Sequence, residues 1–183
     1  MSPDDTELIR AVQGGEREPF QTLVHRHAAP LWSTIRRNVR DPEDARDVLQ
    51  ETWARALERI GDLREPGRLR SWLLSIALNL VRERGRRAPL EVLSDDLADP
   101  GDVAGGASPA GVRAVELHDG ARAVRAEIDR LPPRQREVFD LRMNHELSHA
   151  EIARVLGIAE DASRANYYQA VRRLRAAFPE EPA

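Results

Sequence analysis

Five residues near the C-terminus, His145-Glu146-Leu147-Ser148-His149, match the pattern H-E-x-x-H. In zinc proteases this pattern places two histidine ligands and a general base on one helix, and a third ligand completes the metal site. Here Ser148 is a typical helix cap, so the five residues should straddle a turn, and no histidine follows His149. The sequence therefore favours turn and surface roles for His145 and His149, and it predicts neither a metal site nor a cofactor.

Recognition of phosphates and base edges is the other chemistry that the residue types suggest. The 28 positions counted as lysine or arginine all hold arginine. The arginine fork suits phosphates and guanine edges, although codon bias in a high-GC genome would give the same composition. Because the formal net charge is −3, a nucleic acid would have to meet a local basic surface rather than the chain as a whole.

Charge alternates in blocks along the chain. Residues 41–58 hold six acids against two arginines, and residues 62–87 hold seven arginines against three acids. Residues 91–102 hold five acids and no base, and residues 160–175 are basic again. Such alternation indicates more than one kind of partner surface.

The C-terminal stretch predicts a helix-turn-helix. Ser148 and Glu151 have the capping-box form, Gly157 allows a tight turn, and Asp161 is a good cap for a third helix. The buried side of that helix should hold Tyr167, Ala170, Val171, Leu174 and Phe178, and the opposite side Arg164, Ala165, Tyr168, Arg172 and Arg175. An arginine-bearing face after a glycine turn favours DNA reading, with an ordinary three-helix bundle as the alternative.

Helix-period patterns dominate the rest of the chain as well. One apolar stripe runs through residues 45–60, opened by Asp41-Pro42 and closed by Gly61, and a second runs through residues 69–80 with a basic tail behind it. Upstream, Pro30 should break or kink a helix near Ala29. The stretch 88–111, rich in proline, glycine and acids, predicts a flexible linker. We therefore expect an all-α protein with two small helical domains, residues 1–87 and 112–183.

Composition excludes several classes of protein. The chain has 183 residues, is 41% hydrophobic and has no cysteine, which excludes disulfides, thiolate zinc sites and cysteine nucleophiles. No apolar run is long enough to span a bilayer, and the acids Asp4, Asp5 and Glu7 are atypical of a signal peptide. We expect a cytoplasmic protein without membrane insertion.

Several segments in order resemble the extracytoplasmic-function (ECF) group of the sigma-70 family, the compact bacterial sigma factors. Residues 20–40 resemble the start of conserved region 2, and residues 41–53 (DPEDARDVLQETW) resemble its polymerase-binding helix. Residues 70–79 (RSWLLSIALN) resemble the promoter-opening helix with its "WL..IA.N" core. Residues 131–139 (LPPRQREVF) and 151–158 (EIARVLGI) resemble region 4.

The resemblance implies three binding surfaces. One docks on the beta-prime clamp helices of core RNA polymerase, while region 4 meets the beta flap; the matching clamp-binding residues are Asp44, Asp47, Gln50 and Glu51. A second binds the −10 element as single strand, through residues 63–69 and the helix after them, with Arg64, Arg68, Ser75, Asn79, Arg82 and Arg86. A third reads −35 duplex DNA with Ser148, Arg164, Ala165, Tyr168, Gln169 and Arg172.

Two segments depart from the usual family pattern. The loop Leu63-Arg64-Glu65-Pro66-Gly67-Arg68 has proline and arginine where small polar residues are frequent. Residues 162–169 (ASRANYYQ) replace a more basic stretch at the start of the recognition helix. The −10 and −35 sequence preferences are therefore expected to differ from those of relatives.

The function expected from the resemblance is promoter-specific transcription initiation, with promoter DNA and core polymerase as partners and an anti-sigma factor left open. Such a protein is not an enzyme, since polymerase does the chemistry. The alternatives are a self-sufficient helix-turn-helix regulator, which would need neither the acidic helix nor a second nucleic-acid surface, and a zinc hydrolase. The acidic linker is expected to enter a positively charged polymerase channel as a nucleic-acid mimic, or else to act only as a tether.

Overall fold

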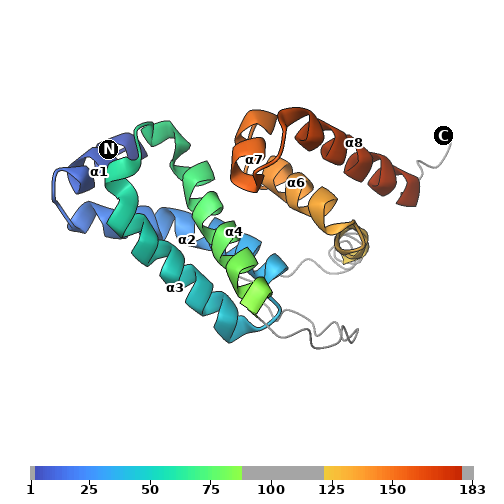
Figure 1. Cartoon of the computed structure of the whole chain (residues 1–183), viewed down its shortest axis with the longest axis horizontal. Helices are drawn as coiled ribbons and strands as arrows, with labels where there is room; N and C mark the ends of the chain where they lie inside the picture. Colours follow the sequence, from blue (N-terminus) through green and yellow to red (C-terminus); the bar gives the residue numbers. More distant parts are fainter. Residues whose placement is uncertain (1–2, 88–121, 179–183) are drawn as a thin grey trace, which may run out of the picture.

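The computed structural model describes residues 3–87 and 122–178, and every secondary-structure element in these two ranges is a helix (Figure 1). The N-terminal half contains α1 (Asp5–Gln13), α2 (Glu18–Asn38), α3 (Pro42–Arg59), the short 3-10 turns η1 (Ile60–Asp62) and η2 (Pro66–Arg68), and α4 (Leu69–Arg87). The C-terminal half contains a helix over residues 122–129, then α6 (Pro133–Met143), α7 (His149–Leu156) and α8 (Glu160–Ala177). The predicted linker 88–111 and its acids lie outside the described residues, as does His118.

Helix α1 ties the N-terminus to the loop after α3. It begins with a capping box, in which the Asp4 carboxylate accepts from the Glu7 amide at 2.8 Å and the Glu7 carboxylate accepts from the Asp4 amide at 3.2 Å. At its other end, Gln13 Nε2 donates to the carbonyls of Ile60 at 2.8 Å and Leu63 at 3.0 Å. These two bonds fix the start of the loop for which the family resemblance implies −10 recognition.

Helix α2 runs continuously through Pro30, so the break expected near Ala29 does not occur. Proline removes one amide donor and crowds the carbonyl four residues earlier, here that of Arg26. Burial on both sides of the proline holds the helix together, since Leu23 and Leu31 are only 1% and 3% exposed. Packing of α2 against α1, α3 and α4 outweighs the local cost of proline.

Helix α3 begins as its sequence predicts and ends differently. The Asp41 carboxylate accepts from the amides of Glu43 and Asp44 at 2.7 and 2.9 Å, and Pro42 takes the first helical position. The helix then passes into η1, so Gly61 lies within a 3-10 turn rather than closing the helix. Most of the predicted stripe is inside, but Leu57 is 42% exposed.

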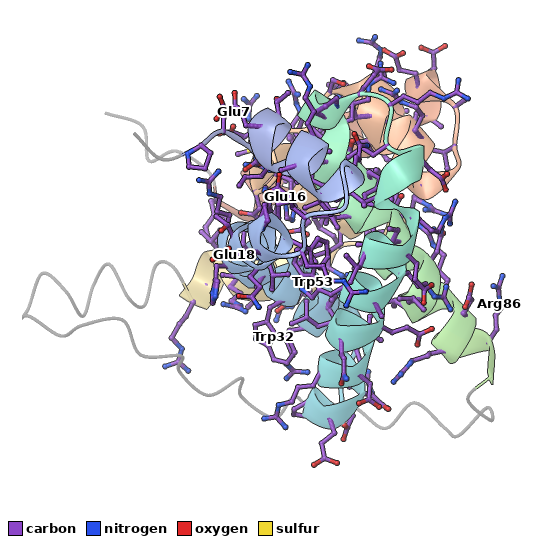
Figure 2. The ribbon with its side chains drawn as sticks, turned by 90° about the vertical axis from the view of Figure 1, so that its left-hand side faces the viewer. Glu7, Glu16, Glu18, Trp32, Trp53 and Arg86 are labelled. Atoms are coloured by element: carbon purple, nitrogen blue, oxygen red, sulfur yellow. The ribbon has the colours of Figure 1, made fainter. Side chains whose placement is uncertain are left out.

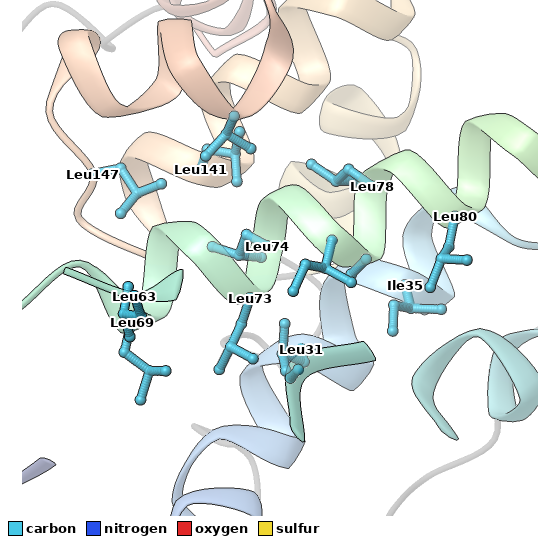
Figure 3. Packing of buried hydrophobic residues seen from close by; sticks show 14 of the residues in the cluster. Leu31, Ile35, Leu63, Leu69, Leu73, Leu74, Leu78, Leu80, Leu141 and Leu147 are labelled. Carbon is cyan, nitrogen blue, oxygen red and sulfur yellow. The ribbon is translucent and has the colours of Figure 1, made fainter. Parts of the chain in front are cut away.

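Helix α4 is buried along two sides, which a single apolar stripe does not predict. Leu73 and Leu80 face α2, as the stripe requires (Figure 3). Leu74 and Leu78 are also buried, at 0% and 2% exposure. Figure 3 shows them on the other side of α4, toward the C-terminal helices, and α7 packs directly on α4. The two halves of the chain therefore share one continuous apolar core in this structure.

The helix-turn-helix forms as predicted from α7, the turn at Gly157 and α8. The capping box joins Ser148 and Glu151, with the Ser148 amide donating to the Glu151 carboxylate at 2.8 Å. After α7, Gly157 takes φ 65°, the left-handed conformation that glycine adopts at little cost and that turns the chain into α8. Helix α6 ends at Met143, so the H-E-x-x-H residues straddle a turn, as the sequence predicts.

Helix α8 departs from its predicted start and from part of its predicted buried side. It begins at Glu160 after Ala159, which makes no side-chain cap, so Asp161 lies inside the first turn instead of capping it. Ala170 is fully buried as expected, whereas Phe178 is 41% exposed because the helix has left the domain by that point. Ser163, which no apolar pattern would select, is fully buried instead.

Candidate polymerase and nucleic-acid interfaces

The exposed side of α3 carries an acidic face, which we define as Asp44, Asp47, Gln50 and Glu51. The side chains of Asp44 and Asp47 are 63% and 64% exposed, and that of Glu51 is 41% exposed. Spacings of three and four residues place these carboxylates on one side of the helix. The structure thus brings together the residues for which the family resemblance implies polymerase docking.

Two arginines already neutralise part of this acidic face, a feature that sequence analysis missed. Arg84 of α4 lies 3.4 Å from Asp44 Oδ1 and 3.6 Å from Asp47 Oδ2. Arg55 Nη2 lies 2.6 Å from Glu51 Oε1. Because these ion pairs are exposed, each contributes at most about 1 kcal/mol. An incoming basic partner could therefore replace either arginine at small cost.

The loop before α4 presents two arginines on a fixed frame. Leu63 and Leu69 are buried at its ends, with 6% and 4% exposure, and η2 fills the space between them. Arg64 and Arg68 are exposed, and Arg68 Nε lies 2.8 Å from a carboxylate oxygen of Glu65. A loop anchored by buried leucines at both ends can hold these guanidinium groups toward a strand of DNA.

The predicted nucleic-acid side of α4 is only partly available. Asn79 and Arg86 are exposed, and Arg82 Nη1 donates to Asn79 Oδ1 at 3.1 Å. Ser75 is half-buried, and its hydroxyl donates to the carbonyl of Trp72 at 2.7 Å. The Ser75 hydroxyl is therefore already hydrogen-bonded within its own helix. Asn79, Arg82 and Arg86 follow one another along the side of α4 where the basic tail begins.

The outer face of α8 consists of exposed residues at the start and middle of the helix. Arg164, Ala165, Tyr168 and Arg172 are exposed, with Tyr168 reaching 64%, and Gln169 is half-buried beside them. Arg164 forms an ion pair with Glu160 one turn earlier. Ser148, also assigned to this surface, is exposed but uses its hydroxyl in the capping box.

The inner side of α8 is fixed by an aromatic cluster. Tyr167 stacks on Phe139 of α6 with ring centroids 6.2 Å apart and meets the His149 ring edge-on at 5.7 Å. His149 Nδ1 lies 2.9 Å from the hydroxyl of the buried Ser163. Burial, with smaller contributions from Arg142 and Arg164, lowers the pKa of His149. His149 therefore helps to position α8 through its contacts with Ser163 and Tyr167.

The other histidine of the pattern, His145, is 3% exposed, so the surface role expected for it is wrong. It lies between the two halves of the chain, where its Nε2 is 2.6 Å from the hydroxyl of Thr34 on α2. Within the two described ranges, no group of histidines and acids has the arrangement of a metal site. Burial of His145 against Thr34 gives the turn after α6 a part in the packing of the two halves.

Comparison with known families assigns both halves of the chain. Residues 23–89 match sigma-70 region 2, and residues 121–174 match sigma-70 region 4. The ECF RNA polymerase sigma factor SigM of Mycobacterium tuberculosis is 32% identical over 173 residues, which cover 93% of this chain and 82% of SigM. The chain belongs to the ECF sigma factors.

Further relatives agree with this assignment. The ECF RNA polymerase sigma factor BldN of Streptomyces coelicolor is 34% identical over 178 residues, which cover 96% of this chain and 66% of BldN. The solved structure of CnrH in complex with the cytosolic domain of CnrY superposes with a TM-score of 0.63 at 25% identity, covering 97% of this chain and 99% of that one. The protein is thus a transcription initiation factor that directs promoter-specific initiation by RNA polymerase.

Placed in the sigma factor, α2 to α4 belong to region 2 and α6 to α8 to region 4. The acidic face, the loop before α4 and the outer face of α8 are then three separate surfaces on two regions. None of the described helices is long and apolar enough to cross a membrane. The family to which the chain belongs is one of transcription initiation factors and not of known enzymes.

Proposed function

We propose that this sigma factor divides its work among the three surfaces. The acidic face of α3 docks on the basic clamp helices of the polymerase beta-prime subunit, where complementary charge gives orientation and rapid encounter. The loop before α4, with Asn79, Arg82 and Arg86, binds the −10 element as an opened strand. The outer face of α8 enters the major groove of the −35 element.

The observation that supports this division is the segregation of charge on exposed helices of a chain whose net charge is −3. Exposed acids gather on α3, whereas exposed arginines gather beside α4 and on α8. Holding an unpaired base costs a few kcal/mol, which stacking and phosphate contacts along an arginine-bearing surface can offset. At the −35 element, Arg164 has the guanidinium fork that reads guanine from the major groove.

The partners follow from this division of surfaces. Polymerase supplies the catalytic site, so the sigma factor itself performs no reaction and works in the cytoplasm, where polymerase and promoters are found. Among the solved structures, CnrH is in complex with the cytosolic domain of CnrY, and the sigma factor RpoE is in complex with the anti-sigma factor NepR. We extend this to an anti-sigma factor for the present chain, as a class of partner only.

The test of the proposed function is run-off transcription with purified core polymerase on a library of randomised −35 and −10 elements. We expect RNA only when the sigma factor is present, from a narrow set of promoters. Arg164→Ala should relax selection at −35 positions, while Arg134→Ala, which removes a comparable exposed arginine paired with Glu137 at 2.9 Å, should not. Absence of RNA from every promoter, or equal RNA from all of them, would contradict the proposal.

A further inference from the structure

The interface between region 2 and region 4 contains a polar cluster, which we call the latch: the buried Thr34, Asp140 and His145, with the partly buried Arg37 and the exposed Arg70. Thr34 is 2% exposed, and its hydroxyl donates to Asp140 Oδ2 at 3.1 Å. The same hydroxyl lies 2.6 Å from His145 Nε2, so it accepts when that nitrogen carries hydrogen. A single side chain of α2 thus connects two residues of region 4.

Two arginines of region 2 complete the latch. Arg37 of α2 forms an ion pair with Asp140, whose side chain is only 8% exposed. Arg70 of α4 donates to the backbone carbonyl of His145 at 3.1 Å. Within region 4, Asn144 donates to the other oxygen of Asp140 at 2.6 Å. The buried carboxylate therefore depends on region 2 for two of its three donors.

Apolar packing surrounds the latch. Leu74 and Leu78 of α4 lie on the side that faces Leu141 and Leu147 of region 4 (Figure 3). Each of these four leucines is at most 4% exposed. The contact thus combines close apolar packing with a buried polar centre whose groups would lose partners on separation, a combination that favours one defined arrangement over loose association.

This arrangement does not fit simultaneous binding of both promoter elements. Helices in contact, such as α4 and α7, lie about 8–10 Å apart. The −10 and −35 elements are separated by about 25 base pairs, or roughly 85 Å at 3.4 Å per base pair. Regions 2 and 4 must therefore separate before α4 and α8 can each reach its own element on the same duplex.

We propose that the latch holds this sigma factor in a closed state that prevents engagement of the two promoter elements together, and that opening the latch is a required step of initiation. The inference rests on the proposed function for its consequence, but the closed state itself is a property of the free chain. Only the open fraction is competent, so a stronger latch lowers the apparent affinity for a complete promoter.

The closed state leaves some surfaces accessible. The outer face of α8 and the carboxylates of the acidic face remain exposed, whereas Leu74, Leu78 and the side of α4 between them are covered by region 4. The latch should therefore spare binding to an isolated −35 duplex and to the clamp. It should act on the step that needs both regions at their promoter spacing.

The first test measures opening in the free, full-length chain. The absence of native cysteine allows nitroxide labels at Ala54→Cys on α3 and Ala176→Cys on α8, both exposed, for pulsed EPR distance measurement. The wild-type latch should give one narrow, short distance. Thr34→Val with Arg37→Gln, which removes both side-chain links from α2, should raise the open-to-closed ratio at least about tenfold, equivalent to about 1.4 kcal/mol.

A matched control makes the same two kinds of substitution inside region 2. Thr52→Val removes a buried hydroxyl that donates to the Val48 carbonyl at 2.7 Å, and Arg59→Gln removes an exposed ion pair with Asp62 at 3.5 Å. This pair should leave the distance unchanged. Circular dichroism checks folding, and Arg37→Gln alone replaces the double variant if helicity is lost. A latch variant with the wild-type distance distribution would overturn the closed state.

The second test measures the consequence with core polymerase. The latch variant should form open complexes on a complete promoter several times faster than wild type and should bind an isolated −35 duplex equally well. An opened latch with an unchanged rate would overturn the inhibitory role. If no variant, wild type included, supports transcription, the proposed function fails, while the EPR distances still decide whether the latch exists.

Discussion

Asn79 lies on the exposed flank of α4 with one side of its amide engaged. Its Oδ1 accepts from Arg82, and among the described residues its Nδ2 has no hydrogen-bond acceptor. The bond from Arg82 leaves the amide nitrogen of this exposed side chain available to an incoming partner. A base opened from the duplex would offer acceptors to that nitrogen, and Arg82 would hold the amide in place while it did so.

From this geometry we predict that Asn79→Ala leaves polymerase binding intact and reduces open-complex formation about tenfold, because one amide-to-base contact is lost. Permanganate reactivity of thymines at the −10 element measures the effect. Gln21→Ala, which removes an exposed amide from α2, is the control and should behave as wild type. Unchanged reactivity in Asn79→Ala would show that the residue does not contact the opened strand.

His145 gives the latch a dependence on pH. Burial first, and then the charges of Arg70 and Arg37, lowers the pKa of His145 to about 4. The neutral ring is therefore the form that fits the closed state, with Asp140 beside the shared Thr34 hydroxyl and His27 across the same small cavity. Once open, His145 should titrate near 6.5, so protons favour the open state as pH falls from about 6.5 toward 4.

We therefore predict that the open-to-closed ratio of the labelled chain rises on the order of tenfold between pH 7.5 and pH 5. His145→Gln keeps a side-chain donor for the Thr34 hydroxyl but cannot titrate, so its ratio should be nearly constant over the same range. Equal pH profiles for the two proteins would mean that His145 does not control the change.

At the scale of elements, the acidic face of α3 owes its position to local signals. Asp41 and Pro42 set the start of the helix, and the apolar period then leaves Asp47 and Glu51 on the outer side. Figure 2 shows α3 along its length, with Trp53 turned toward α2 and charged side chains along its other sides. The face is thus rigid, and its charges can be changed without disturbing the core.

For this face we predict that Asp47→Arg with Glu51→Arg weakens binding to core polymerase at least about tenfold, since attraction to a basic surface becomes repulsion. Affinity capture of core polymerase at two salt concentrations measures the loss. Glu16→Arg with Glu18→Arg, at the exposed turn between α1 and α2 labelled in Figure 2, makes the same charge change elsewhere and should bind normally. Equal capture by both double variants would remove the acidic face from the docking site.

Some features of the elements could be predicted from the sequence, and others could not. Helix ends set by local chemistry, such as those at Asp41, Ser148 and Gly157, were predictable because cap and turn lie within a few residues. The passage of α2 through Pro30 was not, because tertiary packing decides it. For the candidate site, hydrophobic periodicity predicted which sides of the helices face outward. The family resemblance suggested what those sides bind.

Contacts between side chains that are far apart in the chain could not be predicted from the sequence. Arg84 meets Asp44 across 40 residues, and Thr34 meets Asp140 across 106. In the sequence, Thr34 and Asp140 are ordinary polar residues of amphipathic helices, with no periodicity that would predict burial. Their role follows only from the packing of region 4 on the second side of α4, which no single helix encodes.

At the scale of the whole molecule, the distance between regions 2 and 4 depends on the closed state and on the length of the segment that joins them. Residues 88–121 separate the described halves and could span at most about 120 Å if fully extended, enough for the roughly 85 Å between promoter elements. Chain length therefore does not keep regions 2 and 4 together. The contact is stabilised instead by apolar packing between α4 and region 4 and by the polar groups of the latch.

The last prediction concerns the charge of that segment: Glu91, Asp95, Asp96, Asp99 and Asp102. Neutralising all five to glutamine and asparagine keeps length and polarity, so a tether would work as before. If the segment instead occupies a positively charged channel, holoenzyme assembly should weaken several-fold and abortive products should change at low salt, where charge is least screened. Binding to an isolated −35 duplex should not change.

Neutralising Glu16, Glu18 and Glu58 controls for the loss of negative charge. Wild-type assembly and abortive products at low salt would leave the segment only the role of a tether, because its charge would then contribute nothing to the position of the chain in polymerase.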